Sequence, residues 1–163
     1  MSTGRTDPGM NPHDYLTEVV EPNFADLAAN YGSIRLNLNA IHAVDALAAH
    51  IYHGSNGAAP GNDDTHYRSN LAQRDPEFAL LRDIAKAIKH VRLGRGSPKT
   101  SRGDHVEARS LGWDEAAWGD GRWDGPPQVV IQLDGEGIRV VETVAMNALR
   151  LLKAEMTKYG LDK

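Results

Sequence analysis

Cysteine is absent from the 163-residue chain, which excludes a disulfide framework and any zinc site built on thiolates. No apolar run approaches the roughly 18 residues that a membrane-spanning helix requires. The first residues, MSTGRTDPGMNPHD, are polar and carry two prolines, unlike a secretory signal. We therefore expect a protein of a reducing cytoplasm that binds no membrane, in which residues 1–12 form a flexible arm.

Neither sign of charge dominates the sequence, and no segment of domain scale is repeated. Lys and Arg number 18 against 22 Asp and Glu, which gives a net charge of −4 at pH 7 with histidines neutral. Charged residues make up 25% and apolar residues 40% of the chain, as in ordinary soluble globular proteins. A chain of this length buries about 70% of the surface of its unfolded form. We expect a single domain over residues 13–163.

Apolar residues at helical spacing predict most of the fold. Ser33 and Asp75 are suitable N-cap residues, and Pro22 and Pro76 each suit the first turn of a helix. Pro22 can instead break the helix that contains it. Glycines, which tolerate a positive φ, end the predicted helices. The expected helices cover residues 13–30, 33–53, 76–93 and 143–159.

A β-hairpin is predicted near the C-terminus. The sequence QVVIQL (residues 128–133) favours a strand, DGEG supplies a turn, and IRVV (residues 138–141) favours a second strand. The segments without periodicity are expected to be loops, over residues 54–70 and 94–127. The longer loop is expected to contain a helical turn at 107–111 or 114–118. The predicted fold is mainly α, a helical bundle of three to five helices with a late two-stranded β-hairpin.

The second predicted helix carries polar residues on the face opposite its apolar stripe. Arg35 and His42 lie two helical turns apart, about 10.5 Å along the axis, with Asn39 between them. An arginine can hold a phosphate through two parallel hydrogen bonds, and a histidine can transfer a proton near neutral pH. Together these residues suit cleavage of a phosphodiester bond in RNA. A polar face that is merely solvated would carry the same residue types.

The sequence RLNLNAIH, residues 35–42, resembles the motif of the HEPN superfamily, in which an arginine and a histidine are separated by four to six residues. Many members of that superfamily are small helical bundles that cleave RNA without a metal. The resemblance implies a homodimer in which Arg35, Asn39 and His42 of both copies line a catalytic cleft, with no cofactor. It covers this motif and the helical pattern, and Leu36 stands where the family often has a polar residue. Since non-catalytic members are common, the resemblance implies either an endoribonuclease or an RNase-derived RNA-binding protein, of the kind found in toxin and defence systems.

Basic residues are concentrated at the end of the third predicted helix and in the first part of the long loop that follows it. Between residues 86 and 109 there are seven Lys and Arg against Asp104 and Glu107. The helical pattern turns Arg82, Lys86 and Lys89 away from the core. Such a local excess can bind phosphate groups, or it can be a solvated helix end that continues into a loop. The residues expected to bind RNA are Lys86, Lys89, Arg92, Arg95 and Arg102.

A metal site is an alternative use of the same polar face. His50 and His53 are helical neighbours, and Asp63, Asp64 and His66 lie in the loop that follows. Imidazole and carboxylate ligands suit zinc, nickel or iron. The sequence has no HExxH-type signature, however, so we predict neither a metal nor another cofactor.

All three tryptophans of the chain lie in one short segment, GWDEAAWGDGRWDGPP. Trp113, Trp118 and Trp123 are spaced by five residues, which matches neither a strand face nor a helical stripe. Their rings can pin the loop onto the bundle. If they are exposed, they can instead anchor a protein partner. Acidic residues between them argue against a simple nucleic-acid platform.

Two hypotheses of different classes follow. The first is a HEPN-like endoribonuclease or RNase-derived RNA-binding protein, a homodimer with Arg35 and His42 at its cleft and the basic segment beside it. The second is a non-enzymatic interaction or assembly protein that binds a partner through residues 112–127. Exposed tryptophans and a solvated polar face would favour the second.

Overall fold

The computed structural model describes residues 10–122, 125–135 and 137–163. Most of the expected N-terminal arm therefore lies outside the described residues. The helical segments are α1 (Pro12–Tyr15), a π-helical turn (Leu16–Val20), α2 (Glu21–Ala29), α3 (Ile34–Gly54), α4 (Asp64–Arg74), α5 (Pro76–His90), a 3-10 turn (Gly103–His105) and α6 (Val141–Lys158). The strands are β1 (Val106–Arg109), β2 (Gln128–Gln132) and β3 (Ile138–Val140).

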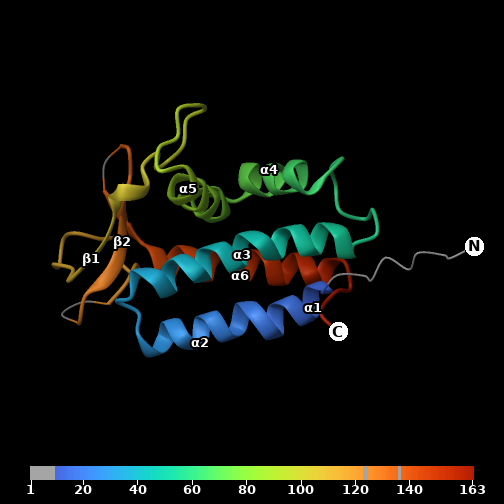
Figure 1. Ribbon diagram of the computed structural model, residues 1–163, viewed down its shortest axis with the longest axis horizontal. Coiled ribbons are helices and arrows are strands. Elements are labelled where there is room, and N and C mark those ends of the chain that lie inside the picture. Colours follow the sequence, from blue (N-terminus) through green and yellow to red (C-terminus); the bar gives the residue numbers. More distant parts are fainter. Residues whose placement is uncertain (1–9, 123–124, 136) are drawn as a thin grey trace, which may run out of the picture.

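Helix α3 is the centre of the bundle. It packs against α6, and it also contacts α2, α4 and α5. Figure 1 shows α3 lying over α6, with α1 and α2 along one side, α4 and α5 along the other, and the sheet at one end. The apolar face predicted for this helix is buried, which confirms its orientation; its members are Leu36, Ala40, Ala43, Val44, Leu47 and Ile51.

The first predicted helix is present and runs without a break from Pro12 to Ala29. Asn11 caps it, since its side-chain oxygen accepts a hydrogen bond of 2.9 Å from the backbone N–H of Asp14. Pro22 lies in the first turn of α2, directly after the π-helical turn. Proline has no N–H to donate to the preceding turn, and the change in hydrogen-bond spacing there lets the helix continue.

Helix α4 is a correction to the predicted loop over residues 54–70. Asp63 caps it by accepting a hydrogen bond of 2.6 Å from the backbone N–H of His66. Only Tyr67 and Leu71 of this helix are fully buried. Two apolar residues four positions apart are too few to form a recognisable helical pattern. Burial against the rest of the bundle therefore stabilises a helix that its own sequence does not indicate.

The sheet has three antiparallel strands in the order β1-β2-β3. The predicted hairpin forms β2 and β3, with Val130 opposite Val140. The third strand, β1, comes from the predicted long loop, and its Val106 lies opposite Ile131. The helical turn expected at residues 107–111 is therefore wrong, because residues 107–109 are extended and pair with β2. Residues 114–118 form turns and bends.

Strand β2 is buried on both faces, which explains its continuous apolar sequence. Val129 and Ile131 belong to the main core that the helices form. Val130 points to the other side and packs with Leu111 and Val140. The sheet is thus a middle layer between the bundle and the loop over residues 111–122. The expected fold class, a mainly helical bundle with a late hairpin, is confirmed.

No helix within residues 10–122, 125–135 and 137–163 combines the length and the apolar character that crossing a bilayer requires.

Candidate functional site

The polar face of α3 is open to solvent. Ser33 caps the helix through a hydrogen bond of 3.4 Å to the backbone N–H of Leu36. Arg35, Asn39 and His42 are all exposed and lie on one side of the helix, opposite the buried stripe. None of the three side chains forms a hydrogen bond or ion pair with another described residue. We call these three residues the α3 stripe.

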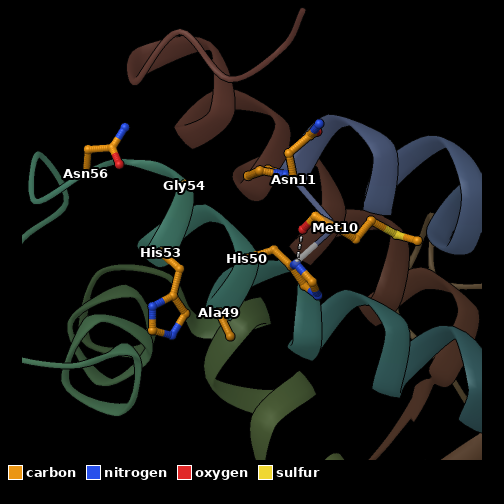
Figure 2. Close-up of a pocket in the computed structure, with 8 residues that line it drawn as sticks. Met10, Asn11, Ala49, His50, His53, Gly54 and Asn56 are labelled. Carbon is orange, nitrogen blue, oxygen red and sulfur yellow. Dashed lines mark hydrogen bonds between the residues drawn. The ribbon is translucent and has the colours of Figure 1, made fainter. Parts of the chain in front are cut away.

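His50 does not share this open environment. Its Nδ1 lies 2.9 Å from the backbone oxygen of Met10, and its ring stacks on Tyr15 with the centroids 4.0 Å apart. Figure 2 shows the hydrogen bond between His50 and Met10, with the ring of His53 lying apart from it. His53 is exposed and meets the ring of Tyr52 edge-on. His50 therefore holds the start of α1 against the end of α3, which is a structural role.

The pocket drawn in Figure 2 lies at this end of α3. It is a hollow of about 550 Å³, and besides the two histidines it is lined by Met10, Asn11, Pro12, Ala49, Gly54 and Asn56. Apart from the two histidines, these lining groups are neutral. The His50 Nδ1 is engaged by the backbone oxygen of Met10 and its ring by Tyr15, so His53 is the exposed imidazole among these lining residues.

The carboxylates that were considered as metal ligands are used elsewhere. Asp63 caps α4, and Asp64 accepts a hydrogen bond of 2.7 Å from Arg68. Within the part of the chain that the structure describes, no group of three or more His, Asp or Glu side chains is arranged to hold a metal ion. The histidines and aspartates named above do not converge.

A half-buried charged cluster joins α3, α4 and α5. Arg68 binds Asp45 at 3.1 Å and Asp64 at 2.7 Å. Arg82 is only 8% exposed and donates a hydrogen bond of 3.3 Å to the Ser69 hydroxyl. Burial lowers the pKa of the Arg82 guanidinium, with the nearby Asp45 acting in the opposite direction. The expectation that Arg82 faces away from the core is wrong, because α4, which was not predicted, covers it.

The basic segment forms an ordered projection. The backbone N–H of Leu93 donates to the oxygen of Ser101 at 2.7 Å, and that of Gly103 donates to the oxygen of Val91 at 2.9 Å. We call residues 91–103 the basic finger. Four of the residues expected to bind RNA are exposed here or just before it: Lys86, Lys89, Arg92 and Arg95. The fifth, Arg102, is half-buried and is paired with Asp104.

The tryptophan-bearing loop is held by residues other than Trp118. Leu111 is buried, and the Asp120 carboxylate accepts hydrogen bonds from Arg139 at 2.9 Å and from the backbone N–H of Val140 at 3.3 Å. Trp113 is 71% exposed and Trp118 is 92% exposed. Trp123 lies outside the described residues. For Trp118, the interpretation that its ring pins the loop onto the bundle is therefore wrong.

The loop has a further anchor on its C-terminal side. The Gln128 side chain accepts a hydrogen bond of 2.7 Å from the backbone N–H of Arg122. The Arg122 guanidinium binds Glu142 at 2.6 Å and lies 4.0 Å from the centre of the Tyr31 ring. These polar contacts were not indicated by the sequence, because their partners come from four separate segments.

Comparison with known proteins adds no relative. No protein-family model, curated protein or solved structure matches this chain. The arguments for function therefore depend on the geometry of the α3 stripe, the basic finger and the tryptophan-bearing loop.

Proposed function

We propose that the α3 stripe is one half of a HEPN-like ribonuclease site and that the protein is a metal-independent endoribonuclease. The observation that carries the proposal is the exposure of Arg35 and His42 on the same side of α3, with no partner among the described residues. Both side chains are thus available to a ligand. The resemblance of residues 35–42 to the HEPN motif supports the same assignment, and it implies a place in a toxin or defence system.

The chemistry follows from the two side chains. The His42 imidazole removes the proton from a ribose 2′-hydroxyl, and the oxygen attacks the adjacent phosphorus. The bond from phosphorus to the 5′-oxygen breaks, which leaves a 2′,3′-cyclic phosphate and a 5′-hydroxyl. Arg35 and the amide of Asn39 stabilise the negative charge that develops on the phosphate oxygens. A second acid must protonate the departing 5′-oxygen.

This second acid comes from another copy of the chain. The other exposed histidine of the helix, His53, is eleven positions from His42, which corresponds to about 16 Å along the axis. It cannot reach the same phosphate group. A homodimer in which two α3 stripes face each other across a two-fold axis supplies the pair of histidines and a pair of arginines.

Cleavage of end-labelled RNA in EDTA tests the proposal. The wild-type protein is compared with His42→Ala, Arg35→Ala and, as a matched control, His66→Ala, which removes an exposed histidine from α4. We expect His42→Ala to slow cleavage by about 10²–10⁴-fold, the usual contribution of a general acid or base. His66→Ala should cleave at the wild-type rate.

Two results would contradict this assignment. One is the absence of cleavage by the wild-type protein across RNAs of varied sequence and structure. The other is equal cleavage by the wild-type protein and a folded His42→Ala variant, since that would remove His42 from the chemistry.

A second candidate function is favoured by the exposure of Trp118. This ring is 92% exposed, although the loop that carries it is anchored by Asp120 and Gln128. An exposed aromatic side chain on an ordered loop is a typical anchor for a protein partner. On this alternative, the protein is a non-enzymatic interaction or assembly protein. Affinity purification from matched cells tests this alternative. A partner protein that binds the His42→Ala variant but not the Trp118→Ser variant would support it.

A further inference from the structure

We propose that the basic finger, together with the end of α5, binds the phosphate backbone of a single-stranded nucleic acid. The surface consists of Lys86, Lys89, His90, Arg92 and Arg95. It is separate from the α3 stripe and does not depend on cleavage at His42. Figure 1 shows the chain after α5 projecting from the bundle before it returns to the sheet.

The base of the finger is fixed to the sheet. Thr100 is fully buried and its hydroxyl donates to the backbone oxygen of Gln132 at 3.2 Å. The backbone N–H of Ser101 donates to the Asp134 carboxylate at 2.9 Å. The backbone N–H of Asp134 in turn donates to the oxygen of Lys99 at 2.8 Å. These bonds hold the returning half of the finger beside the end of β2, so its tip is presented from a defined position.

Close packing fixes the finger to α5 as well. A Cβ atom at Gly103 would lie 2.8 Å from the backbone oxygen of Ala87, so only glycine fits without movement of one backbone. The chain leaves α5 through Val91, which has a φ of 62°. A β-branched residue rarely adopts this conformation, and the surrounding contacts must hold it there.

Among the residues that the structure describes, the nearby carboxylates form no ion pair with the exposed cations, although the charge of Lys86 opposes the rise that burial causes in the pKa of the Asp83 carboxyl. Asp83 accepts a hydrogen bond of 2.9 Å from the backbone N–H of Lys99. Asp134 accepts the bond from Ser101, and the hydrogen bonds from that residue hold the pKa of the Asp134 carboxyl below its usual value. Asp104 is paired with Arg102. The acidic residues of this region therefore form contacts that hold the finger and its base in place.

The cations themselves are unpaired. Within the described ranges, Lys86, Lys89, Arg92 and Arg95 form no ion pair. Other arginines of the protein are paired with carboxylates, namely Arg68, Arg74, Arg102, Arg109, Arg122 and Arg139. A chain with a net charge of −4 thus concentrates positive charge at one place, where the Asp83 carboxylate lines the same hollow as Lys86 and Arg95. Such a patch attracts polyanions over long range.

The shape of the finger suits an extended polyanion. One hollow, of about 710 Å³, is lined by His90, Arg92, Leu93, Gly94 and Arg95. A second, of about 230 Å³, is lined by Asp83, Lys86, Leu93, Arg95, Gly96, Ser97 and Pro98. Arg95 borders both hollows, so one anion chain can pass from the first to the second. A guanidinium binds phosphate through paired hydrogen bonds and lysine acts as a point charge, which favours repeated phosphates as the ligand.

Fluorescence anisotropy with a labelled single-stranded RNA tests this inference. The His42→Ala background keeps the RNA intact and separates binding from cleavage. The finger variant carries Lys89→Gln, Arg92→Gln and Arg95→Gln. The matched control carries Arg150→Gln, Lys153→Gln and Lys158→Gln, which remove the same charge from exposed positions of α6.

We expect the finger variant to weaken binding at least tenfold near 0.1 M salt, while the α6 variant binds within about twofold of the parent. Each lost phosphate contact lowers the slope of log K against log salt by about 0.7 for single strands. Loss of three contacts should therefore reduce the slope by about 2. Single-stranded DNA of the same length should behave in the same way, because the proposed contacts are to phosphate.

The inference is overturned if the finger variant and its parent bind RNA with equal affinity and salt dependence, or if the α6 variant loses as much affinity. It is also overturned if poly-glutamate of the same charge, or vesicles with anionic lipid, compete as well as the nucleic acid. The two proposals can fail separately. Binding of RNA by the finger is measured in the His42→Ala background, so its result does not depend on whether the wild-type protein cleaves RNA.

Discussion

At the scale of single residues, Arg139 of β3 connects several separate segments of the molecule. Its guanidinium binds both oxygens of Glu77 at 2.8 Å, and its Nε binds Asp120 at 2.9 Å. Asn147 adds a hydrogen bond of 3.2 Å to Glu77. The first helical turn of α5, the strand β3, the helix α6 and the tryptophan-bearing loop thus meet at one group of charges. The hydrogen bonds from Arg139 lower the pKa of the Glu77 carboxyl.

Glu77→Gln should reduce the free energy of unfolding at pH 7 by about 1–3 kcal/mol, because hydrogen bonds to a charged group are lost. The pKa of Glu77 is lower in the folded state, so its ionised form stabilises the fold above the usual value of 4.5, and this stabilisation is lost as the pH falls below that value. The difference between the variant and the wild type should therefore shrink between pH 5 and pH 3. Urea denaturation across this range measures it.

Glu18→Gln is the control for this prediction, since Glu18 is exposed and has no ion pair among the described residues. It should change stability little at either pH. An equal loss of stability in Glu77→Gln at pH 7 and pH 3 would show that the charge of Glu77 is not what stabilises the contact.

At the scale of elements, one residue ends α4 and begins α5. The backbone N–H of Asp75 donates to the oxygen of Leu71 at 2.9 Å. Its carboxylate accepts a hydrogen bond of 2.8 Å from the backbone N–H of Phe78. The sequence indicated the second role, because an aspartate before a proline is a recognisable helix start. It did not indicate the first, because α4 has too few apolar residues to be recognised.

Asp75→Ala should lower the free energy of unfolding by about 1 kcal/mol, since the orphan N–H group at the start of α5 loses its acceptor. Asp75→Asn keeps a side-chain oxygen and should lose only a small part of this. Thermal unfolding followed by circular dichroism compares the two variants. If both lose equal stability, the charge of Asp75 matters and its capping bond does not.

At the scale of the whole molecule, the bundle and the sheet share one core. Val129 and Ile131 of β2 lie in the same cluster as Leu47 of α3 and Val144 of α6. The polypeptide also passes from β3 into α6 with no loop, because Val140 ends the strand and Val141 begins the helix. If either the helical bundle or the sheet lost its packing, apolar surface of the other would be exposed. Unfolding of the whole protein should therefore be cooperative.

Ile131→Ala should lower the free energy of unfolding by about 2–5 kcal/mol, because Ile131 is fully buried and its truncation leaves a cavity. Met146→Ala, at a residue that is 40% exposed, should have a much smaller effect. Circular dichroism at 222 nm reports the helices and is compared with calorimetry of the whole protein. Two separate transitions in the Ile131→Ala variant would contradict the shared core.

The candidate sites were predicted to different degrees. Exposure of Arg35, Asn39 and His42 followed from their position opposite the apolar stripe of α3. The same periodicity placed Arg82 outside the core, which was wrong because a neighbouring helix covers it. His50 lies near the stripe in the sequence, yet Met10 and Tyr15 engage it. A helical wheel shows one helix and cannot show which neighbours cover its sides.

Residue spacing within single segments predicted the helices with long apolar stripes, the hairpin and the open face of α3. The presence of α4 and β1, the burial of Arg82 and the exposure of Trp118 follow only from how distant segments pack together. Each of these depends on a partner far away in the chain: β1 pairs with β2, and Asp120 anchors the loop through Arg139. Local patterns carry no information about such contacts, since the contacts exist only once the chain has folded.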